Sequence, residues 1–173
     1  MAEALRIEKL RRDHDVDAFD CGREELNRFL VRFAFPNQQA SASQTYLGLA
    51  GEEVVGYYTL VVGEVSYAGA PERLTKGLAR HPVPIILLAR LAVSAAWQGK
   101  GIGAGLLKDA MRRTLQAAEI AGIRALLVHA VDERAAEFYL RAGFAPSPMR
   151  RLTLLMRARE LSNIRVSLKS SGN

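Results

Sequence analysis

Glycines alternate with other residues at one place in the chain, namely at Gly99, Gly101, Gly103 and Gly105. They lie between an apolar segment, residues 85–93, and a segment with helical periodicity that runs to residue 121. Because glycine has no Cβ, backbone N–H groups at such a junction can close on an anion next to the positive end of the helix dipole. The spacing therefore predicts a phosphate-binding loop, and a pyrophosphate is the group that we expect it to hold.

Two other phosphate-binding patterns fit this segment poorly. A dinucleotide-binding loop needs Gly-x-Gly-x-x-Gly and an acidic residue about 20 positions later at the end of a strand, whereas Glu119 falls inside the predicted helix. A nucleoside-triphosphate loop needs Gly-x-x-x-x-Gly-Lys followed by Ser or Thr, and Lys100 comes too early for that pattern. Glycines can also be simple turn formers, so their spacing alone leaves a loop without a ligand as an open alternative.

A phenol that could act as an acid lies downstream, at Tyr139. It falls in residues 133–142, which are predicted to form a helix that Gly143 ends. A tyrosine hydroxyl can give a proton or a hydrogen bond to a leaving group. The alternative is that Tyr139 is only a buried aromatic ring packed on a sheet.

No acidic residue or histidine stands out as a general base. Asp132 and Glu133 follow a predicted strand and could serve, but a carboxylate in that place is more often a helix cap. His129 is flanked by apolar residues in the same strand and is expected to be structural, while His81 is an alternative base. Neither histidine is placed among the predicted catalytic residues.

The composition predicts one packed domain in a reducing compartment. Of the 173 residues, 49% are hydrophobic and 24% are charged, which favours a buried core over a disordered chain. Residues 1–160 are predicted to form that domain, and residues 161–173 a polar C-terminal tail. Cys21 is the only cysteine, which excludes an intrachain disulfide and a cysteine-based zinc cluster. We expect neither a signal peptide nor a membrane-spanning helix, and a cytoplasmic location fits best.

Positive charge is concentrated in the second part of the chain. The 24 basic and 18 acidic residues give a net charge of +6. Residues 1–96 hold 11 basic and 12 acidic residues, whereas residues 97–173 hold 13 basic and 6 acidic residues. Such a surface attracts phosphate-rich partners by releasing their counterions, although many ordinary proteins are equally basic. The charge alone therefore leaves nucleic-acid binding open.

Hydrophobic patterning predicts a chain of mixed strands and helices. The expected strands are residues 5–10, 45–49, 54–65, 85–93, 123–131 and 151–156, and the expected helices after residue 95 are 99–121 and 133–142. An earlier helix has one apolar stripe, made of Leu26, Phe29, Leu30 and Phe33. Residues 36–43 are expected to form a turn, and residues 66–84 a loop around a short helix.

The glycine-rich segment resembles the acyl-coenzyme A loop of the GCN5-related N-acetyltransferases, the GNAT family, whose pattern is Gln/Arg-x-x-Gly-x-Gly/Ala. Gln98, Gly101 and Gly103 match that pattern. Residues 135–144 resemble the helix and following turn in which that family's tyrosine faces the thioester sulfur. The resemblance implies a mixed α/β fold with a central, mostly antiparallel, splayed sheet flanked by helices. It also implies an enzyme that uses acetyl-CoA as co-substrate and no metal.

The same resemblance implies roles for individual residues. The backbone N–H of Val93 would stabilise the oxyanion, and Tyr139 would protonate the leaving thiolate. The residues that it assigns to acetyl-CoA are Leu91, Ala92, Val93, Gln98, Gly99, Lys100, Gly101, Ile102, Gly103 and Ala104.

A closer resemblance is to the acetyltransferase toxins of toxin–antitoxin operons. It rests on residues 19–22, 26–30, 56–60, 91–93 and 97–101, and spans residues 5–155. In that group the toxin acetylates the amino group of aminoacyl-tRNA, is neutralised by a small ribbon-helix-helix antitoxin, and often forms a homodimer. We therefore expect this activity and these partners. The alternatives are a GNAT enzyme that acts on a small-molecule amine or a protein N-terminus, and a non-catalytic module that binds acyl-CoA or nucleic acid.

An aminoacyl-tRNA acceptor would not need a strong general base to deprotonate it. An α-amino group has a pKa of about 7.7–8.0 and is partly neutral at pH 7, whereas a lysine amine has a pKa of about 10.4. The tRNA phosphates would meet basic side chains, and the candidates are Arg73, Lys76, Arg80, Arg90, Arg150 and Arg151. Arg90 lies inside an apolar run, so if it is buried we expect an ion pair or a phosphate contact.

Overall fold

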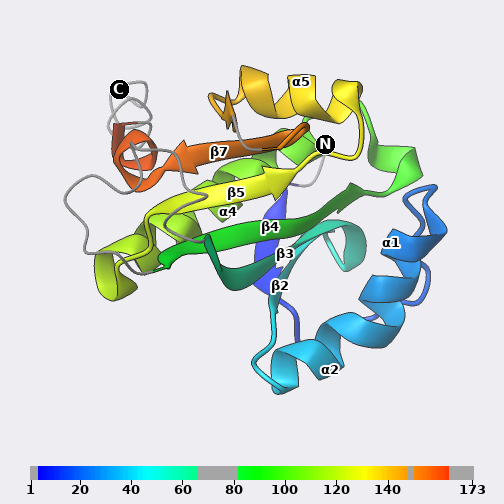
Figure 1. The fold of residues 1–173 in the computed structure, drawn as a ribbon. Coiled ribbons are helices and arrows are strands. Elements are labelled where there is room, and N and C mark those ends of the chain that lie inside the picture. Colours follow the sequence, from blue (N-terminus) through cyan, green and yellow to red (C-terminus); the bar gives the residue numbers. More distant parts are fainter. Residues whose placement is uncertain (1–3, 66–81, 148–149, 164–173) are drawn as a thin grey trace. The chain divides into compact units, whose positions relative to one another are not determined.

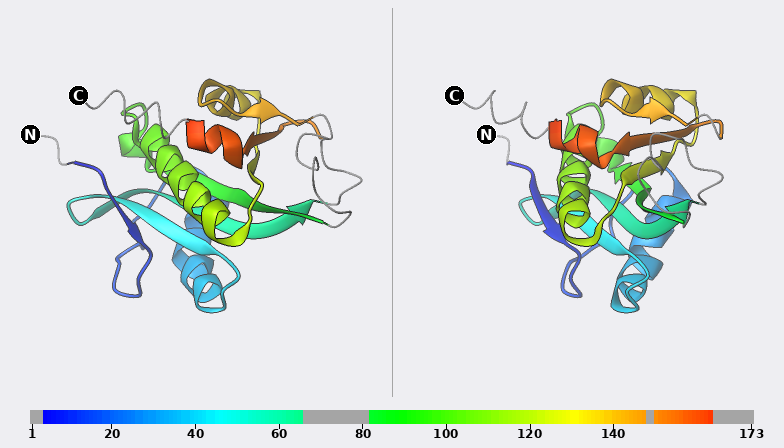
Figure 2. Two further views of the ribbon diagram at one scale, coloured as in Figure 1. Left: turned by 90° about the vertical axis from the view of Figure 1, so that its left-hand side faces the viewer. Right: turned by 60° about the vertical axis from the view of Figure 1, so that its left-hand side comes forward.

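The computed structural model describes residues 4–65, 82–147 and 150–163. Its strands are β1 (Arg6–Lys9), β2 (Gln44–Ala50), β3 (Glu53–Val65), β4 (Val83–Val93), β5 (Ala125–His129), β6 (Ala145–Pro146) and β7 (Thr153–Arg157). Its helices are α1 (Glu24–Arg28), the π-helix η1 (Phe29–Phe33), α2 (Ala34–Gln39), the 3₁₀ turn η3 (Ala95–Trp97), α4 (Ile102–Ala121) and α5 (Glu133–Arg141). Both views in Figure 2 show α4 as one continuous helix.

The strands form a seven-stranded sheet in the order β1-β2-β3-β4-β5-β7-β6 (Figure 1). β2 pairs with β1 and β3 in antiparallel fashion, and β7 does the same with β5 and β6. The mixed α/β fold class with a mostly antiparallel sheet is therefore confirmed. The short strand β6 is an addition that the sequence did not predict, since two residues carry no periodicity.

The chain divides into two compact units, the first made of residues 1–61 and 88–110. Aromatic side chains join α1 and η1 to the sheet within this unit. The rings of Phe19 and Tyr57 meet edge to face with centroids 5.5 Å apart, and the Tyr57 hydroxyl donates to the carbonyl of Leu26 at 2.7 Å. Phe29 stacks on the same tyrosine at 6.3 Å. The helical segment after β1 is thereby held against β3.

The second unit comprises residues 62–87 and 111–173. Its core contains Val83 and Ile85 of β4, Ala125 of β5 and Leu155 of β7. α5 contacts β7 along one side of this layer (Figure 1). Residues 158–163 are helical and Leu161 is buried, so the segment predicted as a polar tail starts with a core residue.

The first predicted helix differs from the expectation in one respect. It is interrupted by the π-helical turn η1 and then continues into α2, where a turn over residues 36–43 was predicted. That prediction is wrong for residues 36–39, because Pro36 lies in the first turn of α2, where a missing N–H is tolerated. It is confirmed for residues 40–42, which form a turn and a bend. The wider π turn also moves Phe33 off the apolar stripe, so that it is 50% exposed while Leu30 is buried.

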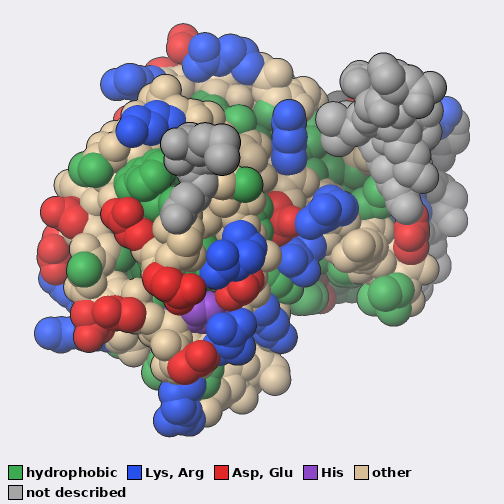
Figure 3. All heavy atoms as spheres, turned by 180° about the vertical axis from the view of Figure 1, so that it is seen from behind, with side chains coloured by type: hydrophobic (Ala, Val, Ile, Leu, Met, Phe, Trp, Pro, Cys, Tyr) green, Lys and Arg blue, Asp and Glu red, His purple; other side chains and the backbone are tan. Residues whose placement is uncertain are grey.

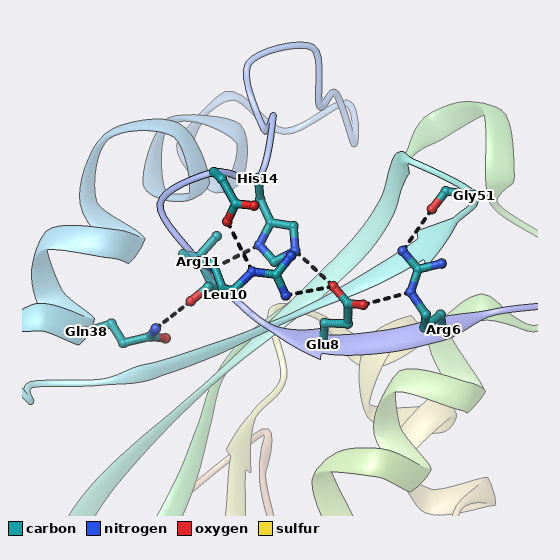
Figure 4. Close-up of polar contacts among 8 residues, drawn as sticks. Arg6, Glu8, Leu10, Arg11, His14, Gln38 and Gly51 are labelled. Carbon is teal, nitrogen blue, oxygen red and sulfur yellow. Dashed lines mark hydrogen bonds and ion pairs between the residues drawn. The ribbon is translucent and has the colours of Figure 1, made fainter.

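Glu8 on β1 accepts hydrogen bonds from several neighbours (Figure 4). His14 Nε2 lies 3.0 Å from its carboxylate, and Arg6 and Arg11 donate at 2.8 and 3.2 Å. The Arg11 backbone N–H donates to His14 Nδ1 at 2.8 Å, so Nε2 is the ring nitrogen that carries the proton toward Glu8. The bonds from His14 and then Arg6 lower the pKa of Glu8 to about 2. Figure 3 shows acidic and basic side chains interspersed on one face of the molecule.

The Glu8→Gln variant is expected to lose stability at neutral pH but not in acid. The pKa of Glu8 in the fold, about 2, lies below its ordinary value of 4.5. Its charged form therefore stabilises the fold above pH 4.5, and this contribution fades as the pH falls toward 2. Thermal unfolding should give Tm values of the wild type and of Glu8→Gln that differ at neutral pH and converge as the pH falls toward 2. A constant gap would contradict the prediction, and Glu24→Gln, on an exposed pair with Arg28, is the control.

Candidate active site

The predicted phosphate loop connects β4 to α4. Gly99 and Gly101 have φ angles of +76° and +82°, the left-handed region that favours glycine. A Cβ built on either residue would meet no heavy atom of the described residues within 4 Å, so this side of the backbone is open. The first bond closing α4 runs from the Gly105 N–H to the Gly101 carbonyl at 3.1 Å. The N–H groups of the helix's first turn therefore have no acceptor within the helix and are suited to an anion.

The side chain of Gln98 holds the end of β4. Its Nε2 donates to the carbonyl of Val93 at 3.0 Å and to that of Cys21 at 3.2 Å. On the other side of the same peptide bond, the Ser94 N–H donates to the carbonyl of Val55 at 2.8 Å. The peptide after Val93 is thus held at both of its polar groups. Gln98 matches the glutamine of the acyl-coenzyme A loop pattern, and its amide nitrogen donates to backbone carbonyls of the protein.

Trp97 and Lys100 lie on the loop between the strand and the helix. The indole N–H of Trp97 donates to Glu53 at 3.2 Å, and the Lys100 ammonium lies 5.0 Å from the centroid of its ring. This distance is that of a cation–π contact. Lys100 is exposed, so its charge adds to the positive potential of the loop.

Tyr139 lies on α5 in the second unit and is buried, at 7% exposure. Its ring meets Phe138 and Phe144 edge to face, with centroids 5.1 and 5.6 Å apart. Burial raises its pKa to about 12, so the phenol remains protonated at neutral pH and can donate. α5 begins at the carboxylate of Asp132, which accepts from the N–H of Ala135 at 2.8 Å. The expectation that Asp132 is a helix cap is confirmed.

His129, at the end of β5, is held by a neighbouring strand. Its Nδ1 lies 2.8 Å from the hydroxyl of Thr153, which is buried on β7. Burial, followed by the charge of Arg150, lowers the pKa of His129. A ring fixed in this way agrees with the structural role expected for it. His81, the other histidine considered, lies outside the described residues.

The basic residues predicted to bind phosphates differ in their contacts and exposure. The Arg90 guanidinium lies 3.7 Å from the centroid of Phe29, the distance of a cation–π contact, and the residue is only partly buried. Arg151 pairs with Glu133 at 2.8 Å, but both side chains are well exposed, so a phosphate can compete for the arginine. Arg150 is exposed. The remaining candidates lie outside the described residues: Arg73, Lys76 and Arg80.

The described residues include neither a metal-binding cluster nor a helix that could span a membrane. Within them, no group of three or more His, Cys, Asp or Glu side chains is placed to hold a metal ion. Among the helices described, none is long and apolar enough to cross a membrane. The thiol of Cys21 is buried, and burial raises its pKa, so a thiolate nucleophile is not available there at neutral pH.

Comparison with known proteins places these features in a family. The acetyltransferase (GNAT) domain matches residues 41–146, which include both the glycine loop and Tyr139. The chain is also 40% identical over 142 residues to the tRNA-acetylating toxin of Mycobacterium tuberculosis. That match covers 82% of this chain and 85% of the relative.

Solved structures of the toxin AtaT have the same fold. AtaT complexed with acetyl-methionyl-tRNAfMet has a TM-score of 0.85 and 30% identity, with 94% of this chain and 99% of that chain covered. A mutant of AtaT bound to acetyl-CoA and the C-terminus of the antitoxin AtaR has a TM-score of 0.80 and 29% identity, with coverage of 95% and 99%. Since the matched domain spans more than half of the sequence and the relative most of it, the chain belongs to the GNAT family of acetyltransferases.

Proposed function

We propose that this chain is the toxin of a toxin–antitoxin pair, and that it transfers the acetyl group of acetyl-CoA to the α-amino group of an aminoacyl-tRNA, which blocks translation. The observation that carries the proposal is its 40% identity, over 82% of the chain, to a tRNA-acetylating toxin. The similarity to AtaT in complex with acetyl-methionyl-tRNAfMet supports the same class of acceptor. The 13 basic and 6 acidic residues of positions 97–173 suit a polyanionic substrate.

The loop after β4 fits the pyrophosphate of acetyl-CoA. Its backbone is open at Gly99 and Gly101, where a Cβ would fill the space needed by an anion, and the first turn of α4 supplies N–H donors. Lys100 adds a positive charge. The residues that we assign to acetyl-CoA are Leu91, Ala92, Val93, Gln98, Gly99, Lys100, Gly101, Ile102, Gly103 and Ala104.

The reaction joins the acceptor nitrogen to the acetyl carbon and breaks the carbon–sulfur bond. The proton that the amine loses ends on the sulfur. We assign the Val93 N–H to the developing oxyanion and the Tyr139 hydroxyl to the leaving sulfur. Because an α-amine has a pKa of about 7.7–8.0, a useful fraction is neutral at pH 7 and no strong base is required.

We propose that basic side chains bind the tRNA backbone. Arg90 is preordered by its contact with Phe29, and Arg151 can exchange Glu133 for a phosphate. The full set that we assign to tRNA is Arg73, Lys76, Arg80, Arg90, Arg150 and Arg151.

The proposal includes partners and a location. Solved complexes of AtaT with the antitoxin AtaR, free and on DNA, support an antitoxin for this chain, and we propose that it is a ribbon-helix-helix protein. We also propose a homodimer, a cytoplasmic location, and a single catalytic domain over residues 1–160.

Labelled acetyl-CoA tests the proposal when it is offered with several acceptors in parallel. These are a total charged-tRNA pool, deacylated tRNA, free amino acids, polyamines and a peptide with a free N-terminus. We expect label on charged tRNA alone. Label only on a free amine or a peptide would instead place the chain among GNAT enzymes with small-molecule or protein acceptors, and would overturn the tRNA assignment.

Gly101→Ala is expected to raise the KM for acetyl-CoA about tenfold, a change of about 1.4 kcal/mol in binding. The new methyl group would stand in the open space before the loop, and the residue would keep a φ angle that costs alanine about 1–2 kcal/mol. Gly122→Ala is a matched control, because Gly122 has a φ angle of +72° and equally open surroundings at the end of α4. If both variants raised the KM for acetyl-CoA equally, backbone strain and not the position in the loop would explain the increase. An unchanged KM in Gly101→Ala would contradict the prediction.

A further inference from the structure

We propose that Asn27, on α1, is a positioning residue of the acetyl-CoA site, acting through the Cys21 carbonyl and the Gln98 side chain. The inference rests on the proposed acetyl-CoA-dependent function and adds to it a residue outside the glycine loop. Asn27 lies within a segment that resembles the toxins, but its residue type alone assigns it no role. A continuous set of hydrogen bonds within the first unit connects it to Gln98.

Asn27 first orders the segment that precedes α1. Its Oδ1 accepts from the Cys21 N–H at 2.9 Å, and its Nδ2 donates to Asp20 Oδ1 at 2.9 Å. The same Asp20 oxygen accepts from the Gly22 N–H at 2.9 Å. The bonds from Gly22 and then Asn27 lower the pKa of Asp20, so its carboxylate is charged and remains an acceptor at neutral pH. Both polar ends of the Asn27 amide are therefore used on residues 20–22.

The ordered segment in turn contacts the strand end and the loop. The Cys21 carbonyl accepts from Gln98 Nε2 at 3.2 Å, and the Asp20 carbonyl accepts from the Ala95 N–H at 2.9 Å. In Figure 1 this segment, just before α1, lies beside the turn that follows β4. Gln98 also donates to the carbonyl of Val93, the residue assigned to the oxyanion. Asn27 is thus connected to both ends of residues 93–98.

The segment has little freedom to absorb a change at Asn27. Cys21 is 8% exposed, and its thiol donates to the carbonyl of Arg23 at 3.6 Å. Phe19, on its other side, is buried against Tyr57. When a hydrogen-bond partner is removed from such a place, the remaining group must move to find another. The Cys21 carbonyl would move with it, and Gln98 would lose one of its two acceptors.

The expected consequence concerns the donor substrate. A residue that orients a ligand-binding group typically affects the affinity for the ligand even though it does not touch the ligand itself. Loss of Asn27 should loosen residues 93–98 and weaken acetyl-CoA binding, while the KM for charged tRNA stays within about twofold. A residue that only stabilised the fold would lower the Tm without separating these two constants.

The experiment measures coenzyme A affinity by calorimetry, in the absence of any acceptor, for the full chain. We expect Asn27→Ala and Gln98→Ala each to weaken binding about five- to twentyfold, since each loses two hydrogen bonds, one of which is partly buried. The Kd of the double variant for coenzyme A should be at most about twice that of the single variant with the larger Kd, because both changes remove the same hydrogen-bonded connection. Gln39→Ala, an exposed amide on α2, is the matched control and should bind normally.

Several results would overturn the inference. Unchanged affinity in Asn27→Ala, or a double variant whose loss equals the product of the single losses, would show that Asn27 does not act through Gln98. If Asn27→Ala does not fold, Gln98→Glu serves instead, because it keeps the size of the side chain but cannot donate to either carbonyl. Normal coenzyme A affinity in that variant would likewise contradict the proposal. A wild type that binds coenzyme A but leaves charged tRNA unmodified would refute the proposed function separately.

Discussion

Tyr139→Phe is expected to slow acetyl transfer about a hundred- to a thousandfold, the range typical of a lost hydrogen-bond donor to a developing charge. Acetyl-CoA binding should change little, because the ring and its edge-to-face contacts with Phe138 and Phe144 are kept. Only the hydroxyl is removed, and with it the hydrogen bond that we assign to the leaving sulfur. The effect should therefore fall on kcat.

The pKa of Tyr139 indicates how this hydroxyl would work. Burial raises the pKa to about 12, whereas an ordinary thiol has a pKa of about 8.5. Full transfer of the phenol proton to the sulfur is therefore uphill, and the favourable role is a hydrogen bond that stabilises the charge growing on sulfur. The proton that finally neutralises the thiolate then comes from the attacking amine. The rate of the wild type should rise with pH through the titration of the acceptor amine, near about pH 8.

Single-turnover transfer to charged tRNA, together with coenzyme A calorimetry, measures this prediction. Tyr46→Phe is the control, because it also removes one hydroxyl from a ring in an aromatic pair, here stacked on Tyr58 at 5.1 Å. Its rate should stay within about threefold of the wild type. A Tyr139→Phe variant with the wild-type rate would remove Tyr139 from the mechanism, and one that no longer binds coenzyme A would give it a packing role.

Gly56→Ala is expected to destabilise the fold by about 2–3 kcal/mol, as overpacking of a core does. A Cβ on Gly56 would lie 2.8 Å from a methyl group of Leu106 and 2.9 Å from the carbonyl oxygen of Ala92. The leucine side chain can rotate, but the oxygen belongs to the backbone of β4 and can move only if the strand moves. For a chain of this size the Tm should fall by about 4–12 °C.

Gly63→Ala, in the same strand, is the matched control. There the new Cβ would lie 3.5 Å from a methyl group of Ile85, which is ordinary van der Waals contact. Thermal unfolding of the two variants should therefore separate clearly, with Gly63→Ala within about 2 °C of the parent. Similar Tm values for both would contradict the close approach of β3, β4 and α4 at Gly56.

Short-range features of the molecule could be predicted from the sequence alone. The glycine loop, the Asp132 cap and the end of α5 at Gly143 each depend on residues within a few positions, whose types limit the local backbone. The strands and helices followed from periodicities of two and 3.6 residues. The family followed from motifs that combine these elements in order, and the comparisons confirmed it.

Periodicity failed where the local backbone departs from the regular helix. Phe33 was placed on the buried stripe because it lies seven residues after Leu26, yet the π turn of η1 leaves it half exposed. An extra residue in a helical turn leaves no mark on the pattern of apolar residues, since the same residue types fit either turn. Pro36, which suggested a turn, lies in the first turn of α2 instead.

Partners distant in sequence were decided only by the tertiary structure. The contact of Arg90 with Phe29 carries no local sequence signal, and neither does the close approach of the Ala92 carbonyl to Gly56. Gln98 and Cys21 are 77 positions apart, and their hydrogen bond exists only because the segment before α1 lies against the turn after β4 within one unit. The sequence alone determined where the glycines with left-handed φ angles lie between β4 and α4, because that property belongs to the local backbone. Which side chains hold the loop in place depends on packing between distant segments, which no local pattern records.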